Sequence, residues 1–218
     1  VVLAEGRVVA DGDVAAINAV EPHVEEPLPI PCAVVGSRSR AAIDDGLASG
    51  ARARIVIRGT MHEGARADNV VGRIERGPKW LVVTTPSSGW FTCAGERGAG
   101  VALFLGLARH LAAKETSHSL LFIANSGHEL GTLGAHRSLA EIAPPPEDVA
   151  CWIHLGASIA ARRWDAAGEA ATPTNEGEPM GNLVGVEALL PELNDAFSGV
   201  AWLKPRSGGP VAGELKHF

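Results

Sequence analysis

The sequence predicts an α/β protein whose sheet is covered by helices on both faces and is preceded by a smaller β-rich domain. From residue 66 onward, continuous apolar runs of strand length alternate with helical patterns, as a sheet buried on both faces requires. Before residue 60, short β-rich runs surround one helical pattern. The hydrophobic content of 46% is ample for a packed core. We place the boundary after residue 62, which predicts domains at residues 1–62 and 63–218.

The N-terminal domain is predicted from four β-rich runs and a helix at residues 39–51. Residues 21–32 are rich in proline and acidic side chains, and because proline lacks a backbone N–H we expect an extended loop there. The chain opens abruptly on a β-rich run, so we expect part of the natural protein to lie upstream. The four runs are VVLAEGRVVA (1–10), VAAINAV (14–20), CAVVG (32–36) and ARIVIRG (53–59).

The C-terminal domain is predicted to contain strands at residues 69–75, 80–85, 119–125 and 150–156, with helices at 98–114 and 129–143. The first helix shows the clearest periodicity. Its expected buried face consists of Val101, Phe104, Leu105, Ala108, Leu111 and Ala112. Beyond residue 163 the pattern predicts a surface excursion (164–182), a helix (186–200), a short strand (201–205) and a glycine-rich loop (206–218).

Charge, hydropathy and cysteine content exclude several classes of function. The net charge is −6 and no cluster of Lys and Arg is present, so we expect no nucleic-acid partner. No run approaches the roughly 18 apolar residues of a membrane helix. Cys32, Cys93 and Cys151 are widely spaced and cannot all pair within the chain, which favours a reducing compartment such as the cytoplasm. The expected partner is a small-molecule or peptide substrate, and the sequence does not predict the oligomeric state.

Polar loops follow three of the predicted strands, at residues 86–100, 125–131 and 154–158. Ligands of open α/β sheets bind beyond the carboxyl ends of the strands, so we expect these loops to form one rim. The side chains that could carry chemistry there are Ser87, Ser88, Trp90, Cys93, Glu96, Arg97, Ser126, His128, Glu129 and His154.

The stretch ANSGHELGTLGAH, residues 124–136, carries the clearest chemical signal of the three loops. His128 and Glu129 could hold a metal, or His128 could act as an acid-base group oriented by Glu129 or Glu96. The stretch does not match the HExxH zinc motif, because His136 lies eight residues after His128 rather than four. We interpret His136 as a structural or surface residue.

The loop at residues 86–100 offers nucleophiles and an anion-binding group. Cys93 precedes a helix N-terminus, a position that lowers the pKa of thiols, and Ser88 follows a strand. Each also fits a structural role, because Cys93 could be an inert packing residue and Ser88 could stabilise a turn. Arg97 could hold a substrate carboxylate at the helix N-terminus or could simply pair with Glu96, and both interpretations remain open.

The order of these motifs resembles the co-catalytic di-zinc aminopeptidase family, whose relatives include glutaminyl cyclase. The resemblance rests on ADNVVGRIERGPKWLVVTTPSSGW, CAGERGAGVALFLGLARHLA, SLLFIANSGHELGTLGAHRSL and CWIHLGA, and covers about residues 66–160. It implies a mixed sheet flanked by helices. Residues 27–59 resemble the later part of the protease-associated domain that is commonly inserted into these enzymes, so the resemblance implies a partial domain of that kind at residues 1–62.

The zinc site of that family is largely replaced here. In chain order, its positions fall on Pro86, Ser88, Glu96, His128, Glu129, Gly156 and Leu215, or His217 if the last loop is shifted. The resemblance implies that Glu129 retains a ligand, Glu96 replaces the bridging aspartate and His128 replaces the general-base glutamate. Pro86 and Gly156 cannot bind zinc through a side chain, so a di-zinc centre is not expected.

Three functions follow from this comparison. The first is a divergent hydrolase that cleaves an amide, peptide or ester bond without metal or other cofactor. In this hydrolase His128 is the general base, and Glu129 or Glu96 orients it. The nucleophile is Cys93, Ser88 or a water molecule that His128 activates. Its substrate would contact Arg97, Trp90, Ser126 and His154. The second is a pseudo-peptidase that binds a peptide or protein partner. The third is a mononuclear zinc hydrolase with zinc on His128, Glu129 and either His154 or Glu96.

Overall fold

The computed structural model describes residues 39–56, 58, 60, 62–89, 93–156, 159, 162–165, 172–177, 183–200, 203–209, 211 and 213–218. The chain divides into two compact units, one of residues 1–65 and 162–175 and the other of residues 66–161 and 176–218. In the first unit α1 (Arg40–Ala48) confirms the predicted helix. No strand is assigned among residues 53–56 and 58, where a β-rich run was predicted, and the three earlier runs lie outside the described residues.

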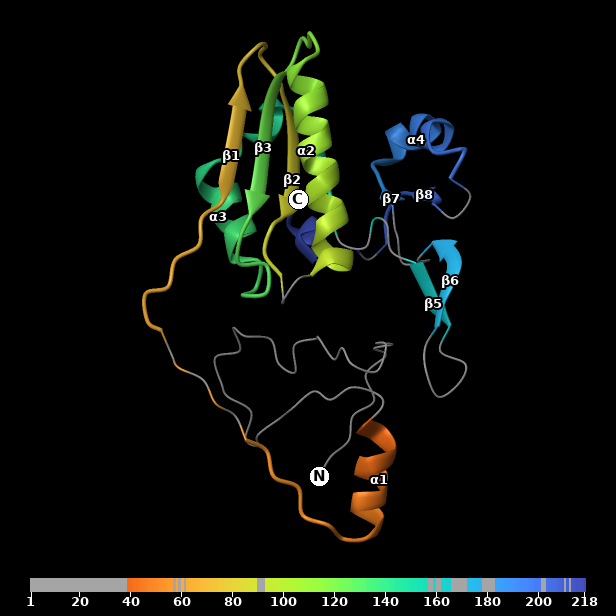
Figure 1. Ribbon diagram of the computed structural model, residues 1–218. Coiled ribbons are helices and arrows are strands. Elements are labelled where there is room, and N and C mark those ends of the chain that lie inside the picture. The colour runs from red at the N-terminus through yellow and green to blue at the C-terminus, as the bar shows by residue number, and fades with distance from the viewer. Residues whose placement is uncertain are drawn as a thin grey trace. The chain divides into compact units, whose positions relative to one another are not determined.

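The second unit is built on a mixed sheet of four strands in the order β1-β3-β2-β4. The strands are β1 (Val70–Ile74), β2 (Trp80–Pro86), β3 (Ser119–Asn125) and β4 (Val149–His154). β1 is antiparallel to β3, whereas β2 is parallel to both β3 and β4. The expected α/β class, with a mixed sheet flanked by helices, is therefore present (Figure 1).

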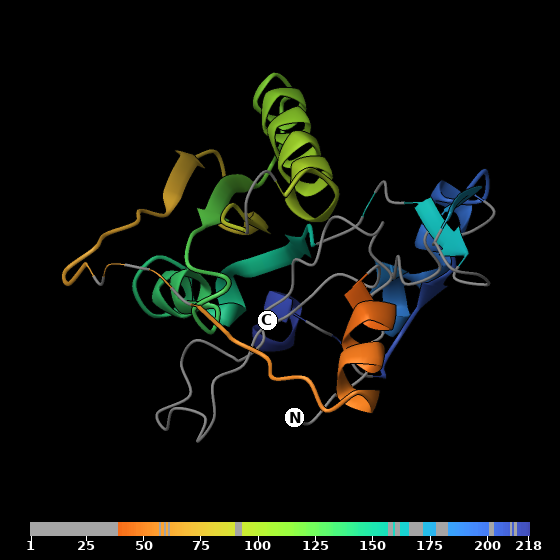
Figure 2. The same ribbon diagram turned by 60° about the horizontal axis from the view of Figure 1, so that its bottom comes forward.

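Helices cover both faces of this sheet, and the strands lie between α2 (Ala99–Ala112) and α3 (Leu133–Glu141) in Figure 2. On one face Leu120 and Phe122 of β3 pack with Phe104 of α2, and the two phenylalanine rings meet edge to face at 5.8 Å. On the other face Leu121 and Ile123 form a second cluster. Successive residues of a strand point to opposite faces, so a strand buried on both faces needs a continuous apolar run such as SLLFIA.

The buried face of α2 differs in part from the prediction. Phe104 is buried and Ala108 and Leu111 pack against the core, as expected, but Leu105 is 56% exposed and Ala112 is exposed. Leu107 packs against the core instead. The true stripe follows the i, i+3, i+4, i+7 spacing from position 104, and an apolar residue beside that stripe need not be buried.

α3 begins four residues later than predicted because the preceding segment forms a turn. Gly127, Gly131 and Thr132 have positive φ angles of 62°, 70° and 59°, which a right-handed helix does not accommodate. The expected helix at 129–143 is therefore wrong at its start. The turn keeps residues 126–131 as a loop at the end of β3.

The remaining elements are short. A two-stranded sheet pairs β5 (Arg162–Asp165) with β6 (Thr172–Gly177). β6 lies inside the predicted surface excursion at 164–182, and β5 begins two residues before it. β7 (Leu183–Val184) pairs in parallel with β8 (Pro205–Arg206), and α4 (Leu190–Ala196) confirms the middle of the predicted helix at 186–200. A 3-10 helix at Gly213–His217 occupies part of the expected glycine-rich loop. Among the described residues, no helix has the length and apolar character needed to cross a membrane.

Candidate functional site

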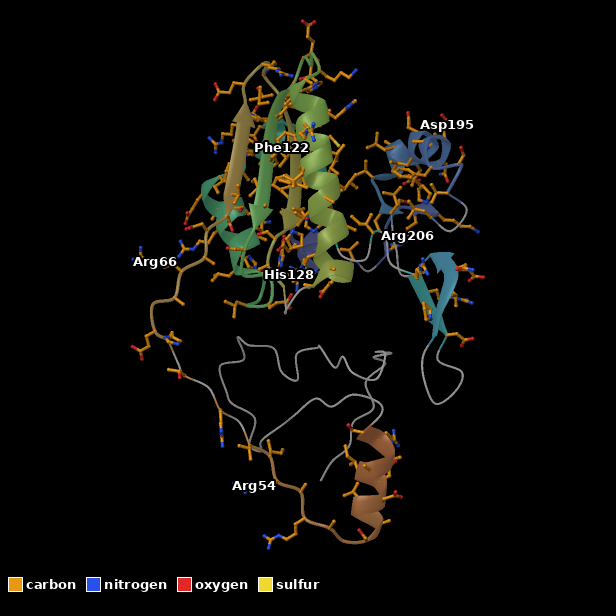
Figure 3. The ribbon with its side chains drawn as sticks, viewed as in Figure 1. Arg54, Arg66, Phe122, His128, Asp195 and Arg206 are labelled. Atoms are coloured by element: carbon orange, nitrogen blue, oxygen red, sulfur yellow. The ribbon has the colours of Figure 1, made fainter. Side chains whose placement is uncertain are left out.

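The carboxyl ends of β2, β3 and β4 meet at one edge of the sheet, and the loops that follow them converge there. Ser87 N donates to Asn125 O at 2.7 Å, and Leu155 N donates to Thr84 O at 2.8 Å. His128 lies at this end of β3, whereas Phe122 lies within the sheet (Figure 3). The backbone therefore brings the predicted polar loops together.

His128 is held at two points. Its backbone N donates to Ser88 Oγ at 3.0 Å, and its ring Nδ1 lies 3.1 Å from Glu214 Oε1. The His128 side chain is 18% exposed, while that of Glu214 is fully buried. Nε2 of His128 has no hydrogen-bond partner among the residues that the structure describes. A histidine held by a buried carboxylate at one nitrogen, with the other nitrogen unbonded, has the geometry of a general base.

Glu214 comes from the C-terminal 3-10 helix and was not among the residues predicted from the sequence. Its second oxygen, Oε2, accepts a hydrogen bond of 2.9 Å from Asn125 Nδ2, which is itself fully buried at the end of β3. The carboxylate that faces His128 is therefore neither Glu129 nor Glu96. The family resemblance placed a metal-ligand position at Leu215, one residue away, and that was the signal that could have identified Glu214.

Arg97 is buried between the two carboxylates that were expected to orient His128. Its Nη2 lies 2.8 Å from Glu129 Oε1 and its Nη1 lies 3.0 Å from Glu96 Oε1. Nε donates to Ser88 O at 2.8 Å, and the side chain is only 6% exposed. Each guanidinium nitrogen thus has a partner within the protein, which favours the pairing interpretation of Arg97.

A cavity of about 570 Å³ adjoins this cluster. One wall is apolar and comes from α2, and the other is polar and comes from the loop after β2. Cys93 contributes to the lining, has a φ of 44°, and its Sγ donates to Glu96 Oε2 at 3.3 Å. The lining residues are Ser87, Ser88, Gly89, Cys93, Arg97, Gly98, Val101, Ala102 and Leu105.

His154 is packed beneath the rim as a neutral imidazole. Its Nδ1 lies 2.9 Å from Thr84 Oγ1, which also accepts a hydrogen bond of 3.0 Å from Trp152 Nε1. Burial lowers the pKa of His154 to about 4, the charge of Glu214 opposes this shift, and nearby positive groups add to it. His154 therefore carries no charge at neutral pH.

The remaining predicted residues lie around this centre. Ser126 is not among the residues that line the cavity, and its N and Oγ both donate to Asn69 Oδ1, at 2.8 and 3.1 Å. The ring of His136 packs 4.3 Å from that of His217, whose pKa is lowered mainly by burial and then by the neighbouring His136. Trp90 lies outside the described residues.

The side chains of this rim do not fit a three-ligand zinc site. In the part of the chain that the structure describes, no group of three or more His, Cys, Asp or Glu side chains could hold a metal ion. Of the expected ligands, Glu129 is paired with Arg97.

Neither a scan against models of known protein families nor a search of curated proteins finds a match to this chain.

Proposed function

We propose that the protein is a divergent, peptidase-like hydrolase that cleaves an amide, peptide or ester bond with His128 as general base. The observation that carries this proposal is the pair formed by His128 and the buried Glu214, in which Nδ1 faces the carboxylate and Nε2 has no partner among the described residues. Such a pair takes up a proton in the transition state because the carboxylate stabilises the imidazolium that forms.

In the proposed reaction, Nε2 of His128 removes a proton from water as the water oxygen bonds to the substrate carbonyl carbon. The carbonyl π electrons move to its oxygen, and the tetrahedral intermediate then expels the amine or alkoxide, which receives the proton from the imidazolium. We propose water as the nucleophile because Ser88 Oγ accepts the backbone N–H of His128, and the thiol of Cys93 donates to Glu96. Backbone N–H groups at the start of the π-helical turn Ala94–Gly98, which leads into α2, are the proposed oxyanion donors.

Arg97 supports a reaction that does not use the di-zinc centre. The resemblance places two carboxylate positions of that centre at Glu96 and Glu129, and the guanidinium of Arg97 lies between these two side chains. A permanent organic cation therefore balances the charges that zinc ions would balance in the family. In addition, Pro86 and Gly156 offer no side-chain ligand.

The cavity supports a small or extended substrate with an apolar portion. Its volume of about 570 Å³ lies within the range of small-molecule sites, and Val101, Ala102 and Leu105 supply an apolar wall. Arg97, the cation in the lining, already faces two carboxylates, so an anionic substrate gains little there. We propose a small molecule or a short peptide as the substrate.

The segment before residue 63 is proposed, on the sequence resemblance of residues 27–59, to be part of a protease-associated domain.

A pseudo-peptidase that binds a peptide is the second candidate function. Its peptide would use the same apolar wall, to which the exposed Leu105 contributes.

The test is turnover of a panel of aminoacyl and acyl amides and esters by the wild-type protein and by His128→Gln. We expect the variant to lose about 10²- to 10⁴-fold in kcat, the usual contribution of a general base. His110→Gln, an exposed histidine on α2, is the matched control and should keep wild-type turnover. Activity should also persist in the presence of a chelator.

Three results would overturn the proposal or parts of it. Unchanged turnover in His128→Gln would remove the assigned base. Loss of activity with chelator would remove the metal-free mechanism. Binding of peptides with no turnover of any substrate would favour the pseudo-peptidase.

A further inference from the structure

A chain of hydrogen-bonded polar side chains leads from Asn69, the residue before β1, to the buried carboxylate of Glu214. Its members are Asn69, Ser138, Asn125 and Glu214, and its last contact is with His128. Ser138, Asn125 and Glu214 are at most 1% exposed, so each polar atom needs a partner inside the protein. Because amide groups and hydroxyls have distinct donor and acceptor atoms, the direction of each hydrogen bond can be derived from the one before it.

The donor-to-acceptor direction of these hydrogen bonds is set first at Asn69, whose side-chain amide is oriented by two backbone groups. Oδ1 accepts from Ser126 N at 2.8 Å, and Nδ2 donates to Gly134 O at 2.8 Å. A backbone N–H can only donate and a backbone carbonyl can only accept, so these contacts leave one orientation of the amide. Nδ2 therefore also donates to Ser138 Oγ, at 2.8 Å.

The direction of the hydrogen bond at Asn69 determines the directions at Ser138 and then at Asn125. Since Ser138 Oγ accepts from Asn69, its own proton is available for Asn125 Oδ1, at 2.7 Å. Asn125 must then present Nδ2 to Glu214, and it donates to Oε2 at 2.9 Å. Glu214 is thus an acceptor at Oε2, as an ionised carboxylate is at both oxygens.

We propose that Asn69, Ser138 and Asn125 are positioning residues that act through Glu214 to hold His128 in the tautomer protonated at Nδ1. Oε1 of Glu214 lies 3.1 Å from His128 Nδ1, so an accepting oxygen requires the ring proton on Nδ1 and leaves the lone pair on Nε2. The importance of that lone pair for catalysis rests on the proposed function, whereas the tautomer itself does not.

The hydrogen-bonded chain Asn69–Ser138–Asn125–Glu214, named the relay from here on, predicts a specific outcome for Glu214→Gln, a change that preserves the shape of the side chain. Asn125 still presents a donor, so the glutamine oxygen must face Asn125 and its NH₂ group must face His128. An NH₂ donor opposite Nδ1 moves the ring proton to Nε2. The same substitution would leave the tautomer unchanged if Asn125 were free to turn its amide over.

The test is nitrogen NMR of the histidine side chains at a pH where the imidazole is neutral, with the His128 signals assigned by their loss in His128→Gln. We expect the wild type to carry the proton on Nδ1 and Glu214→Gln to carry it on Nε2. Ser138→Ala combined with Glu214→Gln releases the amide of Asn125 and should return a large fraction of the Nδ1 form. Asn125→Asp combined with Glu214→Gln exchanges the carboxylate and the amide, and should restore the Nδ1 form.

Glu141→Gln is the matched control, because this glutamate lies exposed on α3 and its change should leave the His128 signals unaltered. The proposal is overturned if His128 is protonated at Nε2 in the wild type. It is equally overturned if Glu214→Gln retains the Nδ1 form, or if Ser138→Ala has no effect on the Glu214→Gln tautomer. If Glu214→Gln does not fold, the wild-type spectrum alone decides.

Turnover measurements separate this inference from the proposed function. For a hydrolase, we expect kcat to fall about 10²- to 10⁴-fold in Glu214→Gln and to recover in part when Asn125→Asp is added. Expected tautomers with no turnover in any protein would refute the hydrolase and leave the relay intact. Turnover that is lost in His128→Gln but unchanged when the tautomer moves would refute the catalytic use of the Nε2 lone pair and leave the relay intact.

Discussion

The start of the relay depends on a glycine, and the substitution Gly134→Ala tests how tightly that region is packed. Gly134 is the second residue of α3 and is buried. A Cβ placed on it would lie 2.1 Å from Ser126 O and 2.6 Å from Asn69 Oδ1. Both distances are far below van der Waals contact, so the backbone at residue 126 or the side chain of Asn69 must move.

The magnitude follows from three contributions. Alanine is favoured over glycine in a helix by about 1 kcal/mol, which raises the free energy of unfolding. Overpacking of a buried site lowers it by about 1–3 kcal/mol. The shift also weakens the hydrogen bonds from Gly134 N to Ser126 O (3.0 Å) and from Ser126 N to Asn69 Oδ1 (2.8 Å), each contributing about 1 kcal/mol. We therefore expect a net loss of about 2–4 kcal/mol.

Urea unfolding of Gly134→Ala and of Gly106→Ala measures this difference directly. Gly106 lies exposed on α2 and a Cβ there meets no atom within 4 Å, so the same substitution should stabilise the protein by about 0.5–1 kcal/mol. The two changes are chemically identical and opposite in expected sign. Equal effects, or stabilisation by Gly134→Ala, would refute the packing derived for the turn after β3.

Three further predictions concern stability. Burial lowers the pKa of His154 to about 4 from the ordinary 6.5, so the unfolded state binds more protons between these values. The free energy of unfolding should then fall by at most about 3 kcal/mol as the pH drops through this window, and His154→Asn should flatten that slope in unfolding curves. In urea unfolding, Phe104→Ala should lower the free energy of unfolding by about 3–5 kcal/mol. Leu103 is 42% exposed, so Leu103→Ala should lower it by less than about 1 kcal/mol. Similar losses in the two variants would contradict the assigned buried face of α2. Arg97→Met should cost about 3–5 kcal/mol because it removes the buried cation beside Glu129, and a change below about 1 kcal/mol would show that the pair is solvated.

The strands of the sheet were predictable from the sequence, whereas the start of α3 was not. Apolar runs such as SLLFIAN report burial on both faces whatever the neighbours are, and β3 is buried along its whole length. The helix expected from residue 129 begins at Leu133, because Thr132 takes a left-handed conformation that a threonine does not predict. Periodicity reports which residues are apolar, and not where a backbone reverses.

The candidate site was predictable in location and only in part in its contacts. Polar loops after neighbouring parallel strands had to meet at one edge, and Ser88, Arg97 and His128 do lie together there. The partner of His128 was not predictable, because Glu214 lies 86 positions further along the chain in a glycine-rich segment without periodicity. Whether His128 acts as a base remains a prediction.

The sequence by itself determined the apolar strands, the amphipathic helix α2 and the set of polar side chains at the rim. These are local properties, since burial preference and helical spacing depend on residue type and short-range order. Only the tertiary structure decided that Arg97 pairs with Glu129 and that Glu214 is the carboxylate that faces His128. Pairing between these charges depends on distances between segments far apart in the chain, and the folding of the sheet and its loops sets those distances.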